Sequence, residues 1–191
     1  MFLQIALMLL DTVFGLLSMA FLARFAMQWA RVSFRNPVGQ FVIAATDWAV
    51  RPARRVIPSA WGLDLPSLLL AWLTQGIYLG LAYGLTAGPF AQFGAIGTLA
   101  MMAVLETIKL ALHLAMGILI ITILLSWINP HAPLAPLFRA LAEPMLRPFQ
   151  RLIPPIGGVD LSPMVPFLLI QIALMLLAGA RSHLLSLTLT L

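Results

Sequence analysis

The residues best equipped to bind a ligand are arginines that stand beside prolines in a pattern that occurs twice, here called the Arg/Pro box. The first copy reads Asp47-x-x-x-Arg51-Pro52-x-x-Arg55-x-Ile57-Pro58-x-x-x-Gly62-x-Asp64, and the second reads Glu143-x-x-x-Arg147-Pro148-x-x-Arg151-x-Ile153-Pro154-x-x-x-Gly158-x-Asp160. Guanidinium groups bind phosphate through paired hydrogen bonds. The boxes therefore indicate sites for anionic lipid headgroups, or contacts with a membrane-protein partner, at Arg51, Arg54, Arg55, Arg147 and Arg151.

The Arg/Pro boxes also have a simpler interpretation, because arginines in cytoplasmic loops fix the topology of a membrane protein. The arginines would then pair with the carboxylates of the boxes; Asp47, for example, stands four residues before Arg51, the favoured order for a helical ion pair. Asp64 and Asp160 directly precede long apolar stretches, where the N-cap of a helix belongs. We expect these two residues to cap helices, with pairing to arginine as the alternative, and Gly62 and Gly158 to permit the tight turns before them.

A second group of polar residues lies inside the apolar stretches. Asp11 stands in the first stretch, and Glu106, Lys109 and His113 share one helix face in the third. An ionisable residue within a membrane span suggests a relay or an ion path. The alternative is structural, with Lys109 pairing with Asp11 or with Glu106 near the outer ends of their spans.

Three further polar residues have expected structural roles in the spans. Gln75 and Gln171 occupy corresponding positions, so we expect them to hydrogen-bond to each other and lock the halves together. Lining a polar path is the lesser option for this pair. Arg24 is expected to extend toward the headgroups from the end of the first span.

Enzymatic and metal chemistry have little support in the sequence. The chain has no cysteine, His131 and His183 are isolated, and no nucleophile, phosphate-loop or dinucleotide motif occurs. We therefore expect no enzyme, no cofactor and no metal site. The net charge of +5 is concentrated in a few loops, which is more typical of membrane topology and anionic lipid than of nucleic-acid binding.

These residues must be positioned by helices in a membrane. Of the 191 residues, 62% are hydrophobic and only 9% are charged, too few to cover a water-facing surface. The fold class is thus all-α membrane. Four transmembrane helices are expected over residues 3–30, 65–85, 98–128 and 161–180. Shorter interfacial helices are expected over 38–50 and 134–145, with irregular backbone at the prolines of each box.

The chain divides into two parallel repeats, each a helix, an interfacial helix, an Arg/Pro turn and a second helix. The first repeat covers residues 1–87, a connection covers 88–97, and the second repeat covers 98–191. Arginines crowd both boxes and are missing from the connection, so the positive-inside rule places both boxes in the cytoplasm and both termini outside.

Specific runs carry a family resemblance over almost the whole chain. The runs Arg24-Phe25-Ala26-Met27-Gln28-Trp29-Ala30 and Arg51-Pro52-Ala53-Arg54-Arg55-Val56-Ile57-Pro58 resemble the first repeat of a tandem YggT-family (YlmG) membrane protein. The run Leu146-Arg147-Pro148-Phe149-Gln150-Arg151-Leu152-Ile153-Pro154, with Gly157-Gly158-Val159-Asp160, resembles the second. The first box departs from the family pattern where Trp61 replaces a glycine and Pro66-Ser67 replaces Ser-Pro.

The resemblance implies a small protein of the bacterial inner membrane without a known enzymatic activity. Members are linked to osmotic-stress tolerance, potassium uptake, cell-division gene neighbourhoods, or plastid nucleoid and cytochrome maturation. We therefore expect a scaffold or accessory factor for other membrane machinery. The alternative is an ion-transport-related protein, that is, a potassium-uptake accessory or a small channel. The third hypothesis is an enzyme of lipid or haem-protein assembly.

Overall fold

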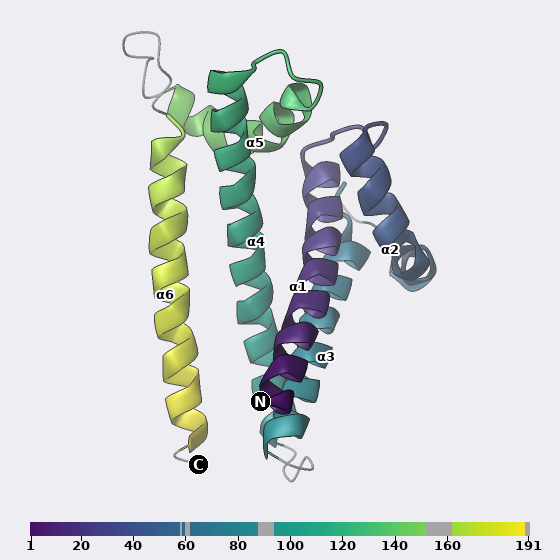
Figure 1. The fold of residues 1–191 in the computed structure, drawn as a ribbon, viewed down its shortest axis with the longest axis vertical. Coiled ribbons are helices and arrows are strands. Elements are labelled where there is room, and N and C mark those ends of the chain that lie inside the picture. Colours follow the sequence, from purple (N-terminus) through teal and green to yellow (C-terminus); the bar gives the residue numbers. More distant parts are fainter. Residues whose placement is uncertain (58, 60–61, 88–93, 152–161, 190–191) are drawn as a thin grey trace.

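The computed structural model of the chain describes residues 1–57, 59, 62–87, 94–151 and 162–189. Six helices occur in this part: α1 (Phe2–Trp29), α2 (Pro37–Val56), α3 (Leu65–Ala87), α4 (Gly94–Ile128), α5 (Ala135–Gln150) and α6 (Met164–Leu189). Figure 1 shows α1 and α4 running in one direction and α3 and α6 returning in the other. The two repeats therefore have the same orientation, and the expected all-α fold of parallel repeats is confirmed.

Four of the helices are long and apolar enough to cross a membrane: α1, α3, α4 and α6. The shortest of them, α3, has 23 residues and is about 34 Å long at 1.5 Å per residue, against a hydrocarbon core of about 30 Å. Large apolar side chains such as Leu16, Ile77 and Met175 remain exposed along these helices. Such exposure is unfavourable in water but favourable in lipid, so the structure is that of a multi-pass membrane protein.

The two shorter helices differ from the expected interfacial segments in length. We expected the prolines of the boxes to impose irregular backbone, but α2 continues through Pro52, and α5 continues through Pro144 and Pro148. Proline removes one backbone hydrogen bond and frees a carbonyl in the preceding turn. Pro52 and Pro148 lie on exposed sides of their helices, where that carbonyl can be hydrated, so the expectation of irregular backbone was wrong there.

The long helices also extend beyond the expected boundaries in the second repeat. Helix α4 begins at Gly94, inside the segment 88–97 that we assigned to the connection, and has 35 residues. Helix α6 continues to Leu189, so the polar residues of the C-terminal tail extend the helix.

Within each repeat, the two long helices are joined by a polar side chain. Gln75 Nε2 donates to the Ser18 hydroxyl over 3.0 Å, and that hydroxyl lies 3.3 Å from the Ala71 carbonyl oxygen. In the second repeat, Gln171 Nε2 lies 3.6 Å from the Met116 sulfur. The two glutamines therefore bind within their own repeats, and the expected bond between them is wrong, because each amide faces the first helix of its own repeat.

The repeats contact each other at two places in the bundle. Trp72 Nε1 on α3 donates to the carbonyl oxygen of Ala100 on α4 over 3.1 Å. Near the short helices, a core cluster places buried Met27 of α1 among residues of α4, α5 and α6, including Leu119 and Leu141. The second repeat therefore holds the end of α1, from which the site described next is built.

Candidate functional site

A buried arginine ties α1 to α2. Arg24 is only 6% exposed, and its Nη1 lies 2.7 Å from both the Thr46 hydroxyl and Asp47 Oδ1. The Thr46 hydroxyl in turn donates to the Val42 carbonyl oxygen one turn earlier over 2.6 Å. The expectation that Arg24 extends toward the headgroups was therefore wrong, because the carboxylates of its own repeat provide a nearer anionic partner.

A buried carboxylate ties the start of α3 to the same network. Asp64 is fully buried, and its Oδ2 lies 2.8 Å from Arg54 Nη2 and 2.7 Å from the Ser67 hydroxyl. Arg24 Nε lies 3.6 Å from the same oxygen, which is too long for a hydrogen bond but close enough for charge attraction. Asp64 thus pairs with two arginines from the position directly before α3.

The backbone around Asp64 has the geometry of a helix start. Its carbonyl oxygen accepts from the amide N–H groups of Ser67 and Leu68, at 3.0 and 3.3 Å. Two residues earlier, Gly62 has φ of 78°, a left-handed conformation that is costly for residues with a Cβ atom. The glycine in the box thus lets the chain reverse so that Asp64 points back at Arg54.

The remaining arginines of the first box lie on the surface. Arg51 Nη2 pairs with Asp47 Oδ2 over 2.7 Å while the side chain stays 79% exposed, and Arg55 is also exposed. Burial raises the pKa of Asp47, but the hydrogen bond and charge of Arg24, with the charge of Arg51, outweigh it and leave this pKa below its ordinary value. Asp47 is therefore ionised at neutral pH, and Arg24 and Arg51 share its charge.

The second box gives a more open arrangement. Arg147 and Arg151 are exposed, as is Glu143, which corresponds to Asp47. Gly158 and Asp160, which we expected to form the turn and the cap, lie outside the described residues. The structure therefore brings together the predicted residues of the first box, whereas for the second box it places only the arginines and the glutamate.

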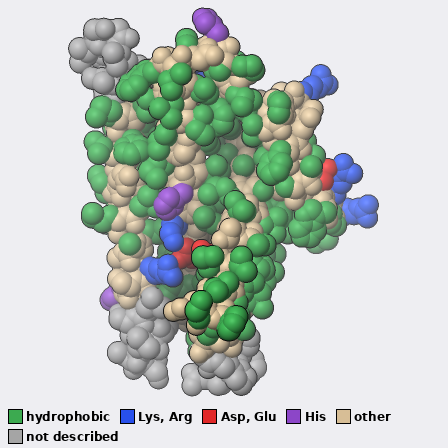
Figure 2. All heavy atoms as spheres, viewed as in Figure 1, with side chains coloured by type: hydrophobic (Ala, Val, Ile, Leu, Met, Phe, Trp, Pro, Cys, Tyr) green, Lys and Arg blue, Asp and Glu red, His purple; other side chains and the backbone are tan. Residues whose placement is uncertain are grey.

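Four ionisable side chains of the long helices, Asp11, Glu106, Lys109 and Arg181, lie together at the opposite end of the bundle. They line a cavity of about 340 Å³ between the repeats, here called the seam cavity, with Leu7, Met8, Asp11, Tyr78, Leu79, Glu106, Lys109 and Arg181 in its wall. Figure 2 shows acidic and basic side chains grouped together in the lower half of one face, next to hydrophobic ones. Asp11, Glu106 and Lys109 thus come together as the sequence suggested.

Each repeat contributes its own polar pairs to the seam cavity. Glu106 Oε2 lies 3.1 Å from Lys109 Nζ, and its other oxygen pairs with Arg181 of α6. Asp11 of α1 and Tyr78 of α3 are the polar side chains that the first repeat contributes to the cavity wall. His113 does not line the cavity; its Nδ1 lies 2.8 Å from the Lys109 carbonyl oxygen. Lys109 therefore pairs within its own helix and not with Asp11.

Several residues of these two sites were not identified from the sequence. Thr46 lies in the middle of α2 and Ser67 in the first turn of α3, and neither stands in a pattern that marks it as a binding partner. Tyr78 and Arg181 lie far from their partners along the chain. The presence of Asp47 four residues before Arg51 did indicate the pair between them. Among the described residues, no group of three or more histidine, cysteine, aspartate or glutamate side chains is arranged to hold a metal ion.

The fold and the network define a class: a multi-pass membrane protein made of two repeats, each with an Arg/Pro box between its long helices. The sequence pattern of the CCB3/YggT family matches the chain twice, over residues 3–85 and 101–181. The chain belongs to this family, and the resemblance noted in the sequence is confirmed.

Relatives that match this chain over most of their own length occur in several bacteria. The chain is 37% identical to the uncharacterised protein PA0392 of Pseudomonas aeruginosa over 178 residues, which cover 90% of this chain and 87% of that protein. It is 35% identical to the uncharacterised protein YggT of Escherichia coli K12 over 165 residues, covering 86% and 84% of the two chains. A comparison with solved structures finds no match.

The buried network predicts unequal effects for two arginine substitutions. Replacing Arg24 with glutamine leaves Thr46 and two carboxylates without their buried cation, so we expect the free energy of unfolding to fall by about 3–5 kcal/mol. Replacing the exposed Arg51 in the same way should cost less than about 1 kcal/mol. Unfolding of the purified protein in mild detergent by increasing amounts of a denaturing detergent measures both. Similar small losses for the two variants would contradict the network's role.

Proposed function

We propose that this protein is a non-enzymatic accessory or scaffold protein of the bacterial inner membrane, which contacts anionic lipid headgroups through α2 and so presents a fixed surface to other membrane machinery. The observation that carries the proposal is that the arginines near α2 differ in exposure. Arg24 is buried and holds the helices together, whereas Arg51 and Arg55 remain exposed. Family membership agrees with a membrane role. The link of this role to osmotic-stress tolerance or cell division rests on the family resemblance alone.

The exposed face of α2 combines apolar and cationic side chains. Phe41, Ala44, Trp48, Arg51 and Arg55 follow one another at spacings of three or four residues, and all five are exposed. Phe41 is 70% and Trp48 67% exposed, so two aromatic rings and two guanidinium groups form a continuous stripe. Aromatic rings favour the headgroup region and arginines favour anionic headgroups, so the stripe suits the surface of a negatively charged leaflet.

The opposite face of α2 is fixed to the bundle, which makes the stripe a stable surface. Val42, Thr46 and Val50 are buried against the long helices, and Asp47 is held by Arg24. A surface whose orientation is fixed by buried contacts loses little conformational entropy when it binds. This rigidity favours a docking role for the α2 stripe over a loosely attached anchor.

The distribution of basic residues supports a cytoplasmic location for the stripe. Arginines crowd α2, α5 and the segment before α2, whereas the connection 88–97 contains no lysine or arginine. Under the positive-inside rule, the short helices face the cytoplasm and both termini face the opposite side. The cytoplasmic leaflet is also the more anionic one, which agrees with the charge of the stripe.

The lipid contact is testable with paired charge substitutions. Replacing Arg51 and Arg55 together with glutamine should lower the preference of the purified protein for phosphatidylglycerol over phosphatidylcholine by about tenfold or more, because each surface cation contributes about 1 kcal/mol at an anionic membrane. Native mass spectrometry of protein released from nanodiscs of the two lipids measures the preference. Arg181→Gln, at the other end of the bundle, is the control and should leave it unchanged. An unaltered preference in the double variant would exclude the stripe as the lipid contact.

The orientation is testable because the chain has no cysteine. Ala44 on α2 and Ser182 near the C-terminal end of α6 are both exposed, so Ala44→Cys and Ser182→Cys each introduce a single accessible thiol. Figure 1 shows α2 and the C-terminal end of α6 at opposite ends of the bundle. A membrane-impermeant maleimide should label Ser182→Cys in intact spheroplasts and Ala44→Cys only in inverted vesicles. The reverse pattern would place the stripe outside the cell and overturn the proposal.

A second candidate function is ion transport, and the seam cavity favours it. The cavity lies between the repeats and is lined by two carboxylates and two cations, among them Asp11 and Lys109. Charged side chains at a repeat interface are a common feature of transporter sites. Glu106, however, is paired with Lys109 and with Arg181, and such ion pairs hold α4 and α6 together. We therefore rank the scaffold function above ion transport.

The two candidate functions predict different effects of a substitution at Asp11. In liposomes that hold the purified protein and an ion-sensitive dye, a scaffold produces no flux above that of empty liposomes, and Asp11→Asn leaves this result unchanged. A transporter produces flux that Asp11→Asn abolishes, whereas Arg51→Gln has little effect on it. Flux that depends on Asp11 would refute the scaffold and establish the second candidate.

A further inference from the structure

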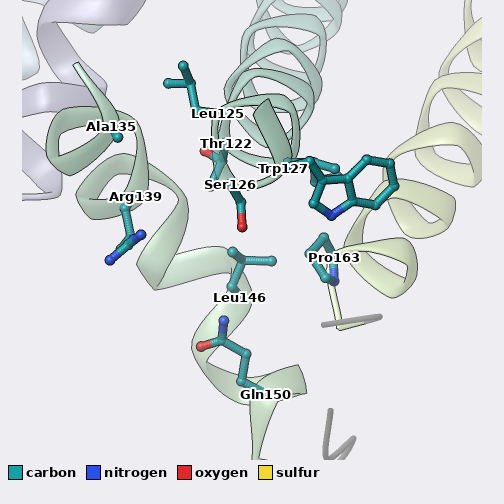
Figure 3. Close-up of a pocket in the computed structure, with 10 residues that line it drawn as sticks. Thr122, Leu125, Ser126, Trp127, Ala135, Arg139, Leu146, Gln150 and Pro163 are labelled. Carbon is teal, nitrogen blue, oxygen red and sulfur yellow. The ribbon is translucent and has the colours of Figure 1, made fainter. Parts of the chain in front are cut away.

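The second repeat contains a cavity where the first repeat contains its ion-pair network. The cavity has a volume of about 300 Å³ and lies where α4, α5 and the start of α6 meet; it is here called the second-repeat cavity. Figure 3 shows Ser126 and Gln150 pointing into it from opposite ends, with Arg139 on one side and Trp127 on the other. Thr122, Leu146 and Pro163 also line the cavity.

The repeats can be matched residue by residue around this cavity. Aligned on Trp29 and Trp127, which stand near the ends of α1 and α4, Arg24 corresponds to Thr122 and Gln28 to Ser126. The boxes themselves match Arg54 with Gln150 and Ser67 with Pro163. All four second-repeat counterparts line the cavity.

Hydrogen bonds support this correspondence. In the first repeat, the Arg24 guanidinium reaches the Val42 carbonyl oxygen through the Thr46 hydroxyl. In the second repeat, the Thr122 hydroxyl donates directly to the carbonyl oxygen of Phe138, which corresponds to Val42. A short side chain thus takes the place of a long one at the same position on the neighbouring helix. The space that Arg24 and Arg54 fill in the first repeat is left open in the second.

The charge of the cavity wall differs from that of its counterpart. Among the described lining residues, Arg139 is the only one with a formal charge, and no described carboxylate forms an ion pair with it. Helices α5 and α6 also begin at this wall, and helix N-termini carry partial positive charge. The end of α4 has the opposite partial charge, but it presents the Ser126 hydroxyl and the Trp127 indole N–H, which donate hydrogen bonds.

We propose that the second-repeat cavity is a binding site for an anionic phosphate group, held by Arg139 with hydrogen bonds from Ser126 and Gln150. Its volume of about 300 Å³ stands at the lower limit of ligand pockets, which suits a phosphate-bearing headgroup and excludes a large cofactor. Trp127 is 68% exposed beside the cavity, where an amphipathic ring suits the boundary between headgroups and acyl chains. A membrane lipid or free inorganic phosphate supplies the same group.

This site is separate from the α2 stripe of the proposed function. The stripe is an exposed face of the first repeat that attracts many headgroups at once, whereas the cavity holds a single phosphate group between three helices. None of the stripe residues lines the cavity. The two proposals can therefore fail independently.

The test uses the full-length protein and two variants that act on the cavity in different ways. Arg139→Gln removes the cation, and Ser126→Phe fills the cavity while keeping the cation; both positions are exposed, so folding should be preserved. Phosphatidylglycerol retained by the protein from nanodiscs is measured by native mass spectrometry, with phosphatidylcholine as the uncharged comparison. In a second arm, inorganic phosphate is titrated into detergent-solubilised protein by calorimetry. We expect each variant to weaken binding about tenfold or more: Arg139→Gln because a charge-assisted hydrogen bond is lost, and Ser126→Phe because the ring occupies the space of the phosphate group.

The two arms identify the source of the phosphate group. Loss of retained phosphatidylglycerol in both variants, with no heat from inorganic phosphate, identifies a lipid headgroup. Inorganic phosphate binding that both variants abolish identifies the free anion. Arg35→Gln removes an exposed arginine that belongs neither to the cavity wall nor to the α2 stripe, so it is the matched control, and lipid retention that depends on Arg139 should survive it. If neither phosphatidylglycerol nor phosphate binding changes in the two cavity variants, the proposal is overturned.

Discussion

A single buried guanidinium group governs the arrangement of the first repeat. Arg24 enters from a membrane-spanning helix, and its charge must be matched because an unpaired ion in a buried position is very costly. Thr46 and Asp47 come from α2, and Asp64 comes from the start of α3, so satisfying one side chain fixes three helices. Buried ion pairs often contribute little net stability, but they do restrict which arrangement of helices is allowed.

The fixed position of α2 explains how arginines in one short segment come to have different roles. Arg54 turns inward to Asp64 and Gln28, whereas Arg51 pairs with Asp47 and stays exposed at the surface. Helix α2 continues through Pro52, and this continuity keeps the aromatic side chains and the arginines on one exposed stripe. The surface available to lipid or to a partner is therefore a consequence of the buried network beneath it.

The two repeats have kept the same backbone plan while their polar interiors have diverged. Each repeat places a long helix, a short helix and a second long helix in the same order and direction (Figure 1). The buried arginine of the first repeat is replaced by threonine in the second, and the space becomes a cavity lined by Arg139 and Gln150. Polar groups thus gather at three places: the Arg24 network, the seam cavity and the second-repeat cavity. About 20 Å of α1 separates Asp11 in the seam cavity from Arg24 in the network, at 1.5 Å per residue.

The sequence by itself determined the fold class, the four spans, the duplication and the family, because apolar length and an ungapped repeated motif are local properties of the chain. It also indicated the pair between Asp47 and Arg51, which are one helical turn apart. It failed at Pro52, where exposure of a helix face decided that the helix continues, and at Gln75 and Gln171, where each amide binds within its own repeat. Only the tertiary structure decided that Arg24 is buried and that the second repeat contains a cavity, since both depend on which side chains meet across helices distant in sequence.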